Sequence, residues 1–164
     1  MTSFRKILVP VDFSEHSDLA LQRAAALSRS CEAPLTIVYV NEPLMLAVPE
    51  GYTIFSEAQL SRMFDWFQER LETEKRAATA AGALSVRALM LQGFADGEIQ
   101  RFAAEGDFDL IVMGTHGRRG LSHALLGSVT ERVVRTAPCP VLSVRAQHGL
   151  TGAAGGNAAR LSRS

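Results

Sequence analysis

Five short apolar runs, separated by segments with helical periodicity, constrain the fold of this chain more than any other feature. The runs lie at residues 7–11, 35–40, 86–91, 110–113 and 141–144. Several of them do not alternate polar with apolar residues, which is typical of strands covered on both faces. Such strands occur in parallel sheets with crossover helices. The sequence therefore predicts an α/β fold with the order βαβαβαβαβ.

The segments between these runs carry signals for the ends of helices. The first helix is predicted to begin near Ser14, and the second opens with a capping box at Ser56 and Gln59 and ends at Gly82. Apolar residues at spacings of three and four are expected to pack on the sheet. They are Ala20, Ala24, Leu27 and Cys31 in the first helix, Leu60, Met63, Phe64, Phe67 and Leu71 in the second, and Ile99, Phe102 and Ala103 in the third.

Length and charge limit the organisation and the partners of the chain. With 164 residues, 47% of them hydrophobic, it suits a single domain, which we place at residues 1–145. Residues 146–164 are small and polar, and we expect a disordered tail. The 17 basic and 17 acidic residues balance, which argues against nucleic acid or an anionic membrane as a partner. No apolar stretch approaches a signal peptide or a membrane span, so we expect a cytoplasmic protein.

Familiar catalytic and metal-binding motifs are absent from the sequence. It contains no G-x-x-x-x-G-K-S/T and no G-x-G-x-x-G after the first strand, so neither a P-loop NTPase nor a dinucleotide dehydrogenase fits. The serine nucleophile elbow G-x-S-x-G is also absent. The four histidines form no metal-binding pair. Cys31 and Cys139 lack the spacing of metal ligands and are interpreted as small buried hydrophobic residues. Residues 41–55 form a long irregular segment, either a lid or partner-facing flap or a passive surface loop.

Two predicted strands end in residues suited to ligand binding. Asp12 follows the first strand directly, and Met113 and Gly114 end the fourth. In open α/β sheets, ligands bind beyond the carboxyl ends of the strands, at the point where the strand order reverses. We therefore expect the first and fourth strands to lie side by side.

The segment from Gly114 to Ser128 is predicted to bind phosphate. Gly114 and Gly117 permit positive φ and allow main-chain N–H groups to approach an anion, and a helix opens at Gly127. Further donors or positive charges are available from Ser128, Thr130, Arg118 and Arg119. The alternative is that residues 128–131 form an S-x-x-E capping box and the glycines only shape the turn, and both interpretations can hold together.

These residues give the chain a resemblance to the universal stress protein family, and specifically to its ATP-binding branch. The G-x2-G-x9-G-S/T pattern of that branch is matched by Gly114, Gly117, Gly127 and Ser128. The sequence Ile-Leu-Val-Pro-Val-Asp at residues 7–12 is similar to the first strand of the family, and residues 38–40 and 137–141 are similar to its second and last strands. The resemblance spans residues 4–145.

The resemblance implies a single-domain, Rossmann-like fold similar to adenine-nucleotide hydrolases. Its open five-stranded parallel sheet has the order 3-2-1-4-5, with helices on both faces, and a homodimer forms through Val141–Val144. Asp12 and Val40 would contact adenosine, and Asp12 alternatively serves as a turn residue at the start of the first helix. The full set of implied nucleotide-binding residues is Pro10, Val11, Asp12, Val40, Met113, Gly114, Gly117, Gly127, Ser128, Val129 and Thr130. A Mg²⁺ or Mn²⁺ ion would be held by the phosphates.

Three functions follow as hypotheses. The leading one is a universal stress protein that binds ATP, ADP or AMP in a regulatory or signalling role, with little or no hydrolysis, because no general base or phosphate-gripping lysine is evident. The second is a slow ATP hydrolase or phosphotransferase with His116 as the proton carrier. The third is a dimeric interaction module without nucleotide, in which residues 41–55 meet a partner.

Overall fold

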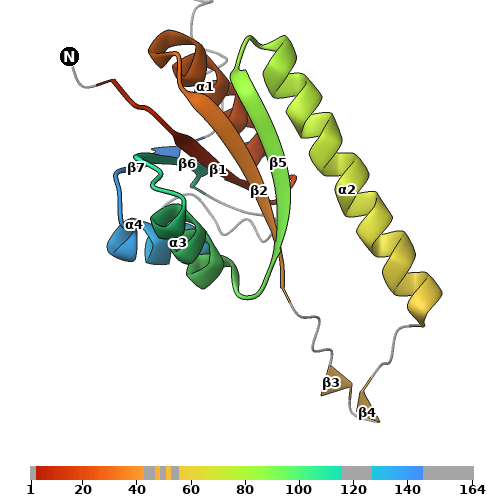
Figure 1. Ribbon diagram of the computed structural model, residues 1–164. Helices are drawn as coiled ribbons and strands as arrows, with labels where there is room; N and C mark the ends of the chain where they lie inside the picture. Colours follow the sequence, from red (N-terminus) through yellow and green to blue (C-terminus); the bar gives the residue numbers. More distant parts are fainter. Residues whose placement is uncertain (1–2, 43–46, 49–50, 53–55, 116–126, 146–164) are drawn as a thin grey trace, which may run out of the picture.

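A five-stranded parallel sheet forms the centre of the protein in the computed structural model (Figure 1). Its order is β5-β2-β1-β6-β7, which is 3-2-1-4-5 when these five strands are numbered along the chain, so the predicted fold class is confirmed. The structure describes residues 3–42, 47–48, 51–52, 56–115 and 127–145. The strands of the sheet are β1 (Ile7–Val11), β2 (Pro34–Asn41), β5 (Leu84–Gln92), β6 (Leu110–Gly114) and β7 (Val141–Val144).

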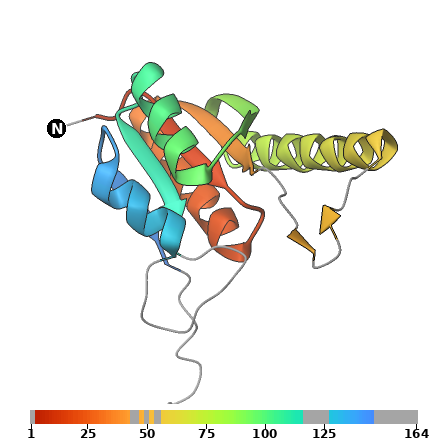
Figure 2. The ribbon, with the colours of Figure 1, turned by 90° about the horizontal axis from the view of Figure 1, so that it is seen from below.

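Helices cover both faces of this sheet, as the sequence predicts. They are α1 (Glu15–Cys31), α2 (Glu57–Ala80), α3 (Ala95–Glu105) and α4 (Ser128–Thr136). The first two pack on one face and the last two on the other, which is clear when the molecule is seen from below (Figure 2). Figure 2 also shows that α2 extends beyond the edge of the sheet.

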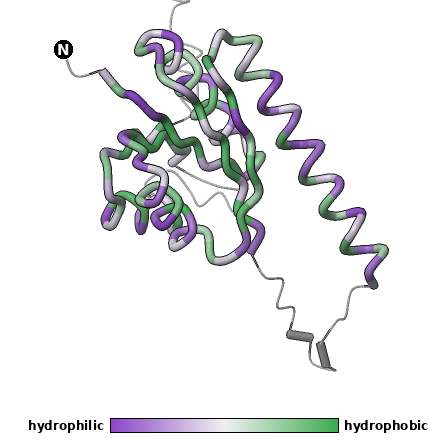
Figure 3. Tube along the Cα trace, in the orientation of Figure 1, coloured by the Kyte–Doolittle hydropathy of each residue, from purple (hydrophilic) through white to green (hydrophobic). Residues whose placement is uncertain are grey.

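The central strands β1 and β6 are apolar along their whole length, and both of their faces are buried. Ile7, Leu8 and Val9 of β1 are fully buried, with Leu8 facing α3 and α4 and its neighbours facing α1 and α2. The hydropathy colouring in Figure 3 shows the central strands as largely apolar and the helices as a mixture of polar and apolar residues. Burial on two faces therefore explains the non-alternating pattern from which the parallel sheet was predicted.

Two predicted helix starts are confirmed by their hydrogen bonds. The hydroxyl of Ser14 accepts a hydrogen bond from the Ser17 amide at 3.3 Å. At the start of α2, the Ser56 amide donates to the side chain of Gln59 at 2.9 Å, and the Gln59 amide donates to the Ser56 hydroxyl at 3.3 Å. The second pair is a complete capping box.

The predicted apolar stripe of α2 is correct only in part. Phe67 and Leu71 are buried, whereas Leu60 is 37% exposed because the first turns of α2 lie beyond the sheet. The sequence analysis missed Glu74, which is only 8% exposed on this face. The interpretation of the two cysteines as buried hydrophobic residues is correct in part, because both pack against the hydrophobic core but are only half-buried. Burial also raises the pKa of the Cys139 thiol, with a smaller contribution from the charge of Asp109.

The segment predicted to be irregular contains a short antiparallel hairpin. Its strands are β3 (Ala47–Val48) and β4 (Gly51–Tyr52). The other residues of this segment from 43 to 55, and the expected tail at 146–164, lie outside the described residues. Within the described part of the chain, no helix has both the length and the apolar character needed to cross a bilayer.

Candidate functional site

The carboxyl ends of β1 and β6 lie side by side, as expected from the sequence. Ile7 pairs with Leu110 and Leu8 with Ile111 in parallel register. The chain proceeds from β1 outward to β2 and β5 on one side and resumes at β6 on the other, so the strand order reverses between β1 and β6. This is the position at which open α/β sheets bind ligands.

Asp12, at the end of β1, lies in the turn that starts α1. One of its carboxylate oxygens, Oδ1, accepts hydrogen bonds from the Ser14 amide at 3.1 Å and from the Ser14 hydroxyl at 2.6 Å. Ser14 in turn caps α1. The turn role that the sequence left open for Asp12 is therefore present, and the same contacts fix the carboxylate at the carboxyl edge of the sheet.

Gly114, at the end of β6, is required by the close approach of α1. A Cβ atom at this position would lie 2.8 Å from the carbonyl carbon and oxygen of His16 and 2.9 Å from its Cβ. The positive φ predicted for this glycine is wrong, because its φ is not in the left-handed region, and the approach of its main chain to an anion stays a prediction. Gly114 allows the first turn of α1 to pack directly on the end of β6.

The start of α4 differs from the predicted capping box. Gly127 is the N-cap residue, with φ −58° and ψ 146°, and Ser128 is already the first helical residue. The cap residue has no side chain and makes no side-chain cap hydrogen bond, so Ser128 does not play the predicted capping role. The amides of the first turn of α4 are therefore left without a side-chain acceptor from the cap, which is the arrangement that binds anions at helix N-termini.

Thr130 braces α4 against β6. Its hydroxyl donates to the carbonyl oxygen of Gly114 at 2.8 Å, and the residue is only 5% exposed. The proton of this hydroxyl is thus used within the protein, and the predicted role of Thr130 as a donor to phosphate is not supported. Gly127 is held beside the same strand end by a 2.7 Å hydrogen bond from its amide to the carbonyl of Thr115.

The remaining predicted residues divide between described and undescribed parts of the chain. Pro10, Val11 and Met113 are buried in β1 and β6 near their carboxyl ends, and Val40 is half-buried near the end of β2. Val129 is half-buried in the first turn of α4, and Ser128 is exposed there. Residues predicted within the phosphate loop but lying outside the described residues are Gly117, Arg118, Arg119 and His116.

An aromatic cluster next to Asp12 was not predicted from the sequence. Phe13 has a φ of 62° and stacks on Tyr39, with ring centroids 4.8 Å apart. Trp66 and Phe67 of α2 also pack against the Phe13 ring. These residues come from the turn after β1, from β2 and from α2, and sequence spacing does not show that they lie together. The sequence signal available was the bulky residue between Asp12 and Ser14.

Charged side chains join α1 and α2 beside this cluster. Burial raises the pKa of Asp18, opposed by Arg70 and reinforced by Asp12 and Glu15. Burial also raises the pKa of Glu74, with a further contribution from Asp18, although Arg70 lies 3.6 Å away. Burial outweighs the single arginine at both carboxylates.

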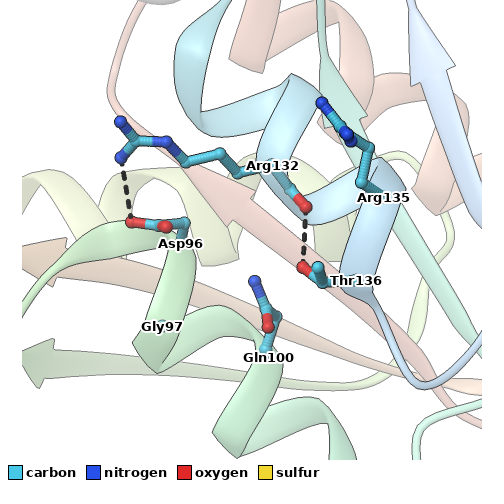
Figure 4. Close-up of a pocket in the computed structure, with 6 residues that line it drawn as sticks. All are labelled: Asp96, Gly97, Gln100, Arg132, Arg135 and Thr136. Carbon is cyan, nitrogen blue, oxygen red and sulfur yellow. Dashed lines mark hydrogen bonds and ion pairs between the residues drawn. The ribbon is translucent and has the colours of Figure 1, made fainter.

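A shallow hollow lies between α3 and α4, away from the predicted residues (Figure 4). Arg132 from α4 reaches across it to Asp96 at 3.7 Å, and the hydroxyl of Thr136 donates to the Arg132 carbonyl at 2.7 Å. None of the predicted nucleotide-binding residues lines this hollow. In the described part of the chain, no three potential metal-binding side chains come together.

The chain is similar in sequence and in fold to universal stress proteins. The model of the universal stress protein family matches residues 3–145. A universal stress protein of Methanocaldococcus jannaschii is 37% identical over 145 residues, which cover 87% of this chain and 82% of the relative. The solved structure of the universal stress protein UspA from Lactobacillus plantarum is similar with a TM-score of 0.75 and 25% identity, covering 88% of this chain and 100% of that one.

A solved structure with a bound nucleotide has the same fold. It is the universal stress protein from Archaeoglobus fulgidus in complex with dAMP. Its TM-score to this chain is 0.62 at 23% identity, covering 87% of this chain and 99% of that one. At this identity the similarity shows a common fold.

Proposed function

The chain belongs to the universal stress protein family, and from this premise we propose that it binds an adenine nucleotide at the carboxyl ends of β1 and β6. The proposed ligand is ATP, ADP or AMP, and the role is regulatory, in the cytoplasm, with little or no hydrolysis. The observation that carries the proposal is the first turn of α4, which begins at a glycine cap without a side chain and is joined to Gly114 at the switch point of the sheet.

The first turn of α4 fits the phosphates. Exposed amides at a helix N-terminus and the positive end of the helix dipole attract an anion without a charged side chain. Gly127 brings no side chain into this space, and Thr130 holds the helix start against β6 through the Gly114 carbonyl. A Mg²⁺ or Mn²⁺ ion would be held mainly by phosphate oxygens.

The ends of β1, β2 and β6 fit the adenosine half. Val40 and Met113 are apolar residues near the carboxyl ends of β2 and β6, the two strands that flank β1, and Asp12 follows β1. Apolar side chains and a carboxylate at one edge of the sheet suit a purine and a polar sugar. That Archaeoglobus fulgidus protein, which has the same fold, binds dAMP. Because Asp12 already accepts two hydrogen bonds from Ser14, we assign it to binding rather than to proton transfer.

We also propose that the protein forms a homodimer through β7. This strand is the edge of the sheet, and Leu142 on it is 40% exposed. An unpaired strand edge with an exposed apolar side chain is suited to pairing with a second copy. A dimer would allow nucleotide occupancy in one protomer to be sensed by its partner.

Isothermal titration calorimetry with Mg-ATP tests the proposal. Gly127→Asp and Gly127→Asn both place a helix-capping side chain at a position whose φ of −58° any residue can adopt, so both variants should fold. We expect Gly127→Asp to weaken binding more strongly than Gly127→Asn, because only the carboxylate repels phosphate. Gly97→Asp on α3, where a Cβ atom meets no neighbour within 4 Å, is the matched charge control and should bind normally.

The outcomes separate the candidate functions. Binding by the wild type that is lost in Gly127→Asp and kept in Gly97→Asp supports the proposed site. Absence of binding by the wild type would refute the proposal and favour the nucleotide-free interaction module. Loss of binding in Gly97→Asp alone would show that the ligand binds in the hollow between α3 and α4.

A further inference from the structure

Phe13 has a backbone conformation that its side chain disfavours. Its φ of 62° lies in the left-handed region, which glycine adopts readily and bulky residues rarely adopt. It follows Asp12 directly and precedes Ser14, whose amide and hydroxyl bind the Asp12 carboxylate. A conformation of this kind persists when surrounding contacts hold it in place, and here it lies within the proposed adenosine site.

Among the described residues, ring contacts to Phe13 come from β2 and α2. Tyr39 of β2 stacks on it with centroids 4.8 Å apart and an interplanar angle of 23°. From α2, Trp66 meets it edge-on at 5.9 Å, and Phe67 lies parallel to it at 6.4 Å. The guanidinium carbon of Arg70 lies 5.3 Å from the ring centroid, within range of a cation–π interaction. Three of these four partners belong to α2.

Arg70 is itself fixed between α1 and α2. Its guanidinium lies 3.6 Å from the carboxylate of Glu74, one turn further along α2, and 37% of its side chain is exposed. It also opposes the burial-raised pKa of Asp18 on α1. Arg70 thus lies over the Phe13 ring while its charge acts on a carboxylate of α1 and on one of α2.

We propose that Phe13 is a positioning residue, through which α2 sets the carboxylate of Asp12 and through which nucleotide occupancy is transmitted back to α2. This inference rests on the proposed nucleotide site. Trp66 and Arg70 of α2 hold the ring, the ring holds the backbone of the turn, and the turn presents Asp12. A ligand that displaces Asp12 therefore moves the ring against Trp66.

The single tryptophan of the chain makes this coupling measurable. Trp66 is 48% exposed and contacts Phe13 and Phe67, so its fluorescence responds to a movement of the Phe13 ring. It lies on α2, whereas the proposed ligand contacts lie on β1, β2, β6 and α4. A change in its emission on nucleotide binding reports transmission between elements.

The test combines calorimetry and Trp66 fluorescence during titration of the full chain with Mg-ATP. Phe13→Leu removes the ring and Phe13→Tyr keeps it, while Arg70→Met removes the cation and Arg70→Lys keeps it. We expect Phe13→Leu and Arg70→Met to bind about threefold to tenfold more weakly than wild type, with the tyrosine and lysine variants restoring affinity. The fluorescence change in the wild type should saturate with the calorimetric isotherm.

The results of these titrations separate the role of Phe13 from the nucleotide site itself. ATP binding without a change in Trp66 emission, or unchanged affinity in both Phe13→Leu and Arg70→Met, would overturn the inference and leave the nucleotide site intact. A lower melting temperature in Arg70→Met with wild-type affinity would also overturn it, because Arg70 would then act only in stability. No calorimetric binding by the wild type would instead refute the nucleotide site, and the inference with it.

Discussion

Gly114 lies at the contact between α1 and β6, and its missing side chain is a packing requirement. We predict that Gly114→Ala lowers the free energy of unfolding by about 1–3 kcal/mol, because the new Cβ would lie 2.8 Å from backbone atoms of His16 that cannot move without shifting α1. Urea unfolding followed by circular dichroism measures the change.

Gly97→Ala is the matched control for this substitution. Its Cβ meets no neighbour within 4 Å, and alanine is the better helix former, so this variant should be as stable as wild type or more stable by up to about 1 kcal/mol. Equal stability of Gly114→Ala and wild type would show that α1 does not pack on the end of β6 as described.

The sequence indicated that a glycine at position 114 is significant, but the contact that requires it could not be predicted. A glycine that ends a strand before a second glycine three residues later indicated a phosphate loop with positive φ. The structure shows no positive φ at Gly114 and instead a close contact with His16, which is about a hundred positions away in the sequence. Local spacing carries no information about such a contact. The left-handed backbone conformation of Phe13 was not predicted for the same reason, because the partners of its ring lie on β2 and α2.

At the level of elements, the hydrogen bond from Thr130 to Gly114 joins α4 to β6. We predict that Thr130→Val, which keeps the shape and removes the hydroxyl, destabilises the protein by about 1–3 kcal/mol, because the Gly114 carbonyl loses its buried partner. The same change at Thr136, an exposed residue whose hydroxyl bonds only within α4, should cost about 0.5 kcal/mol or less.

Thermal unfolding of both threonine variants provides the measurement. A cost at Thr130 no greater than that at Thr136 would contradict the role of Thr130 as a brace. If the brace is correct, Thr130→Val should also weaken nucleotide binding more than Thr136→Val does, because the start of α4 would no longer be held at the strand end.

Helix starts were predictable only where a side chain makes the cap. Ser14 and the pair Ser56 and Gln59 were identified because their hydrogen bonds are local. The S-x-x-E pattern at Ser128 failed because Gly127 takes the cap position without a side-chain bond. The apolar stripe of α2 was extended too far, to Leu60, because periodicity does not show where the sheet beneath a helix ends.

At the level of the molecule, the exposed edge strand β7 is the proposed dimer interface. We predict that Leu142→Glu converts the dimer to a monomer, because it introduces a charge at an apolar strand edge where a second copy would repeat it. Sedimentation velocity measures the change. Leu84→Glu, on the opposite edge strand β5 and 43% exposed, is the control and should remain dimeric. A monomeric wild type, or a dimer in both variants, would contradict this assignment.

The sheet order was the most predictable property of the whole molecule. Apolar runs covered on both faces specify a parallel sheet, and the resemblance to the family supplied the order 3-2-1-4-5, which the structure confirms. The neighbours of Asp12 and the hollow between α3 and α4 were not predictable, because they arise from side chains that different elements bring together. The ligand itself stays a prediction, founded on the start of α4 and on family membership.

Amide resonances of the protein, recorded by two-dimensional NMR during titration with Mg-ATP, test the nucleotide site most directly. We predict saturable shifts at Asp12, Val40, Gly114 and the first turn of α4 from Gly127, with little change at Gln100 and Thr136 beside the hollow. Shifts concentrated at Gln100 and Thr136, or no shifts at millimolar ATP, would contradict it.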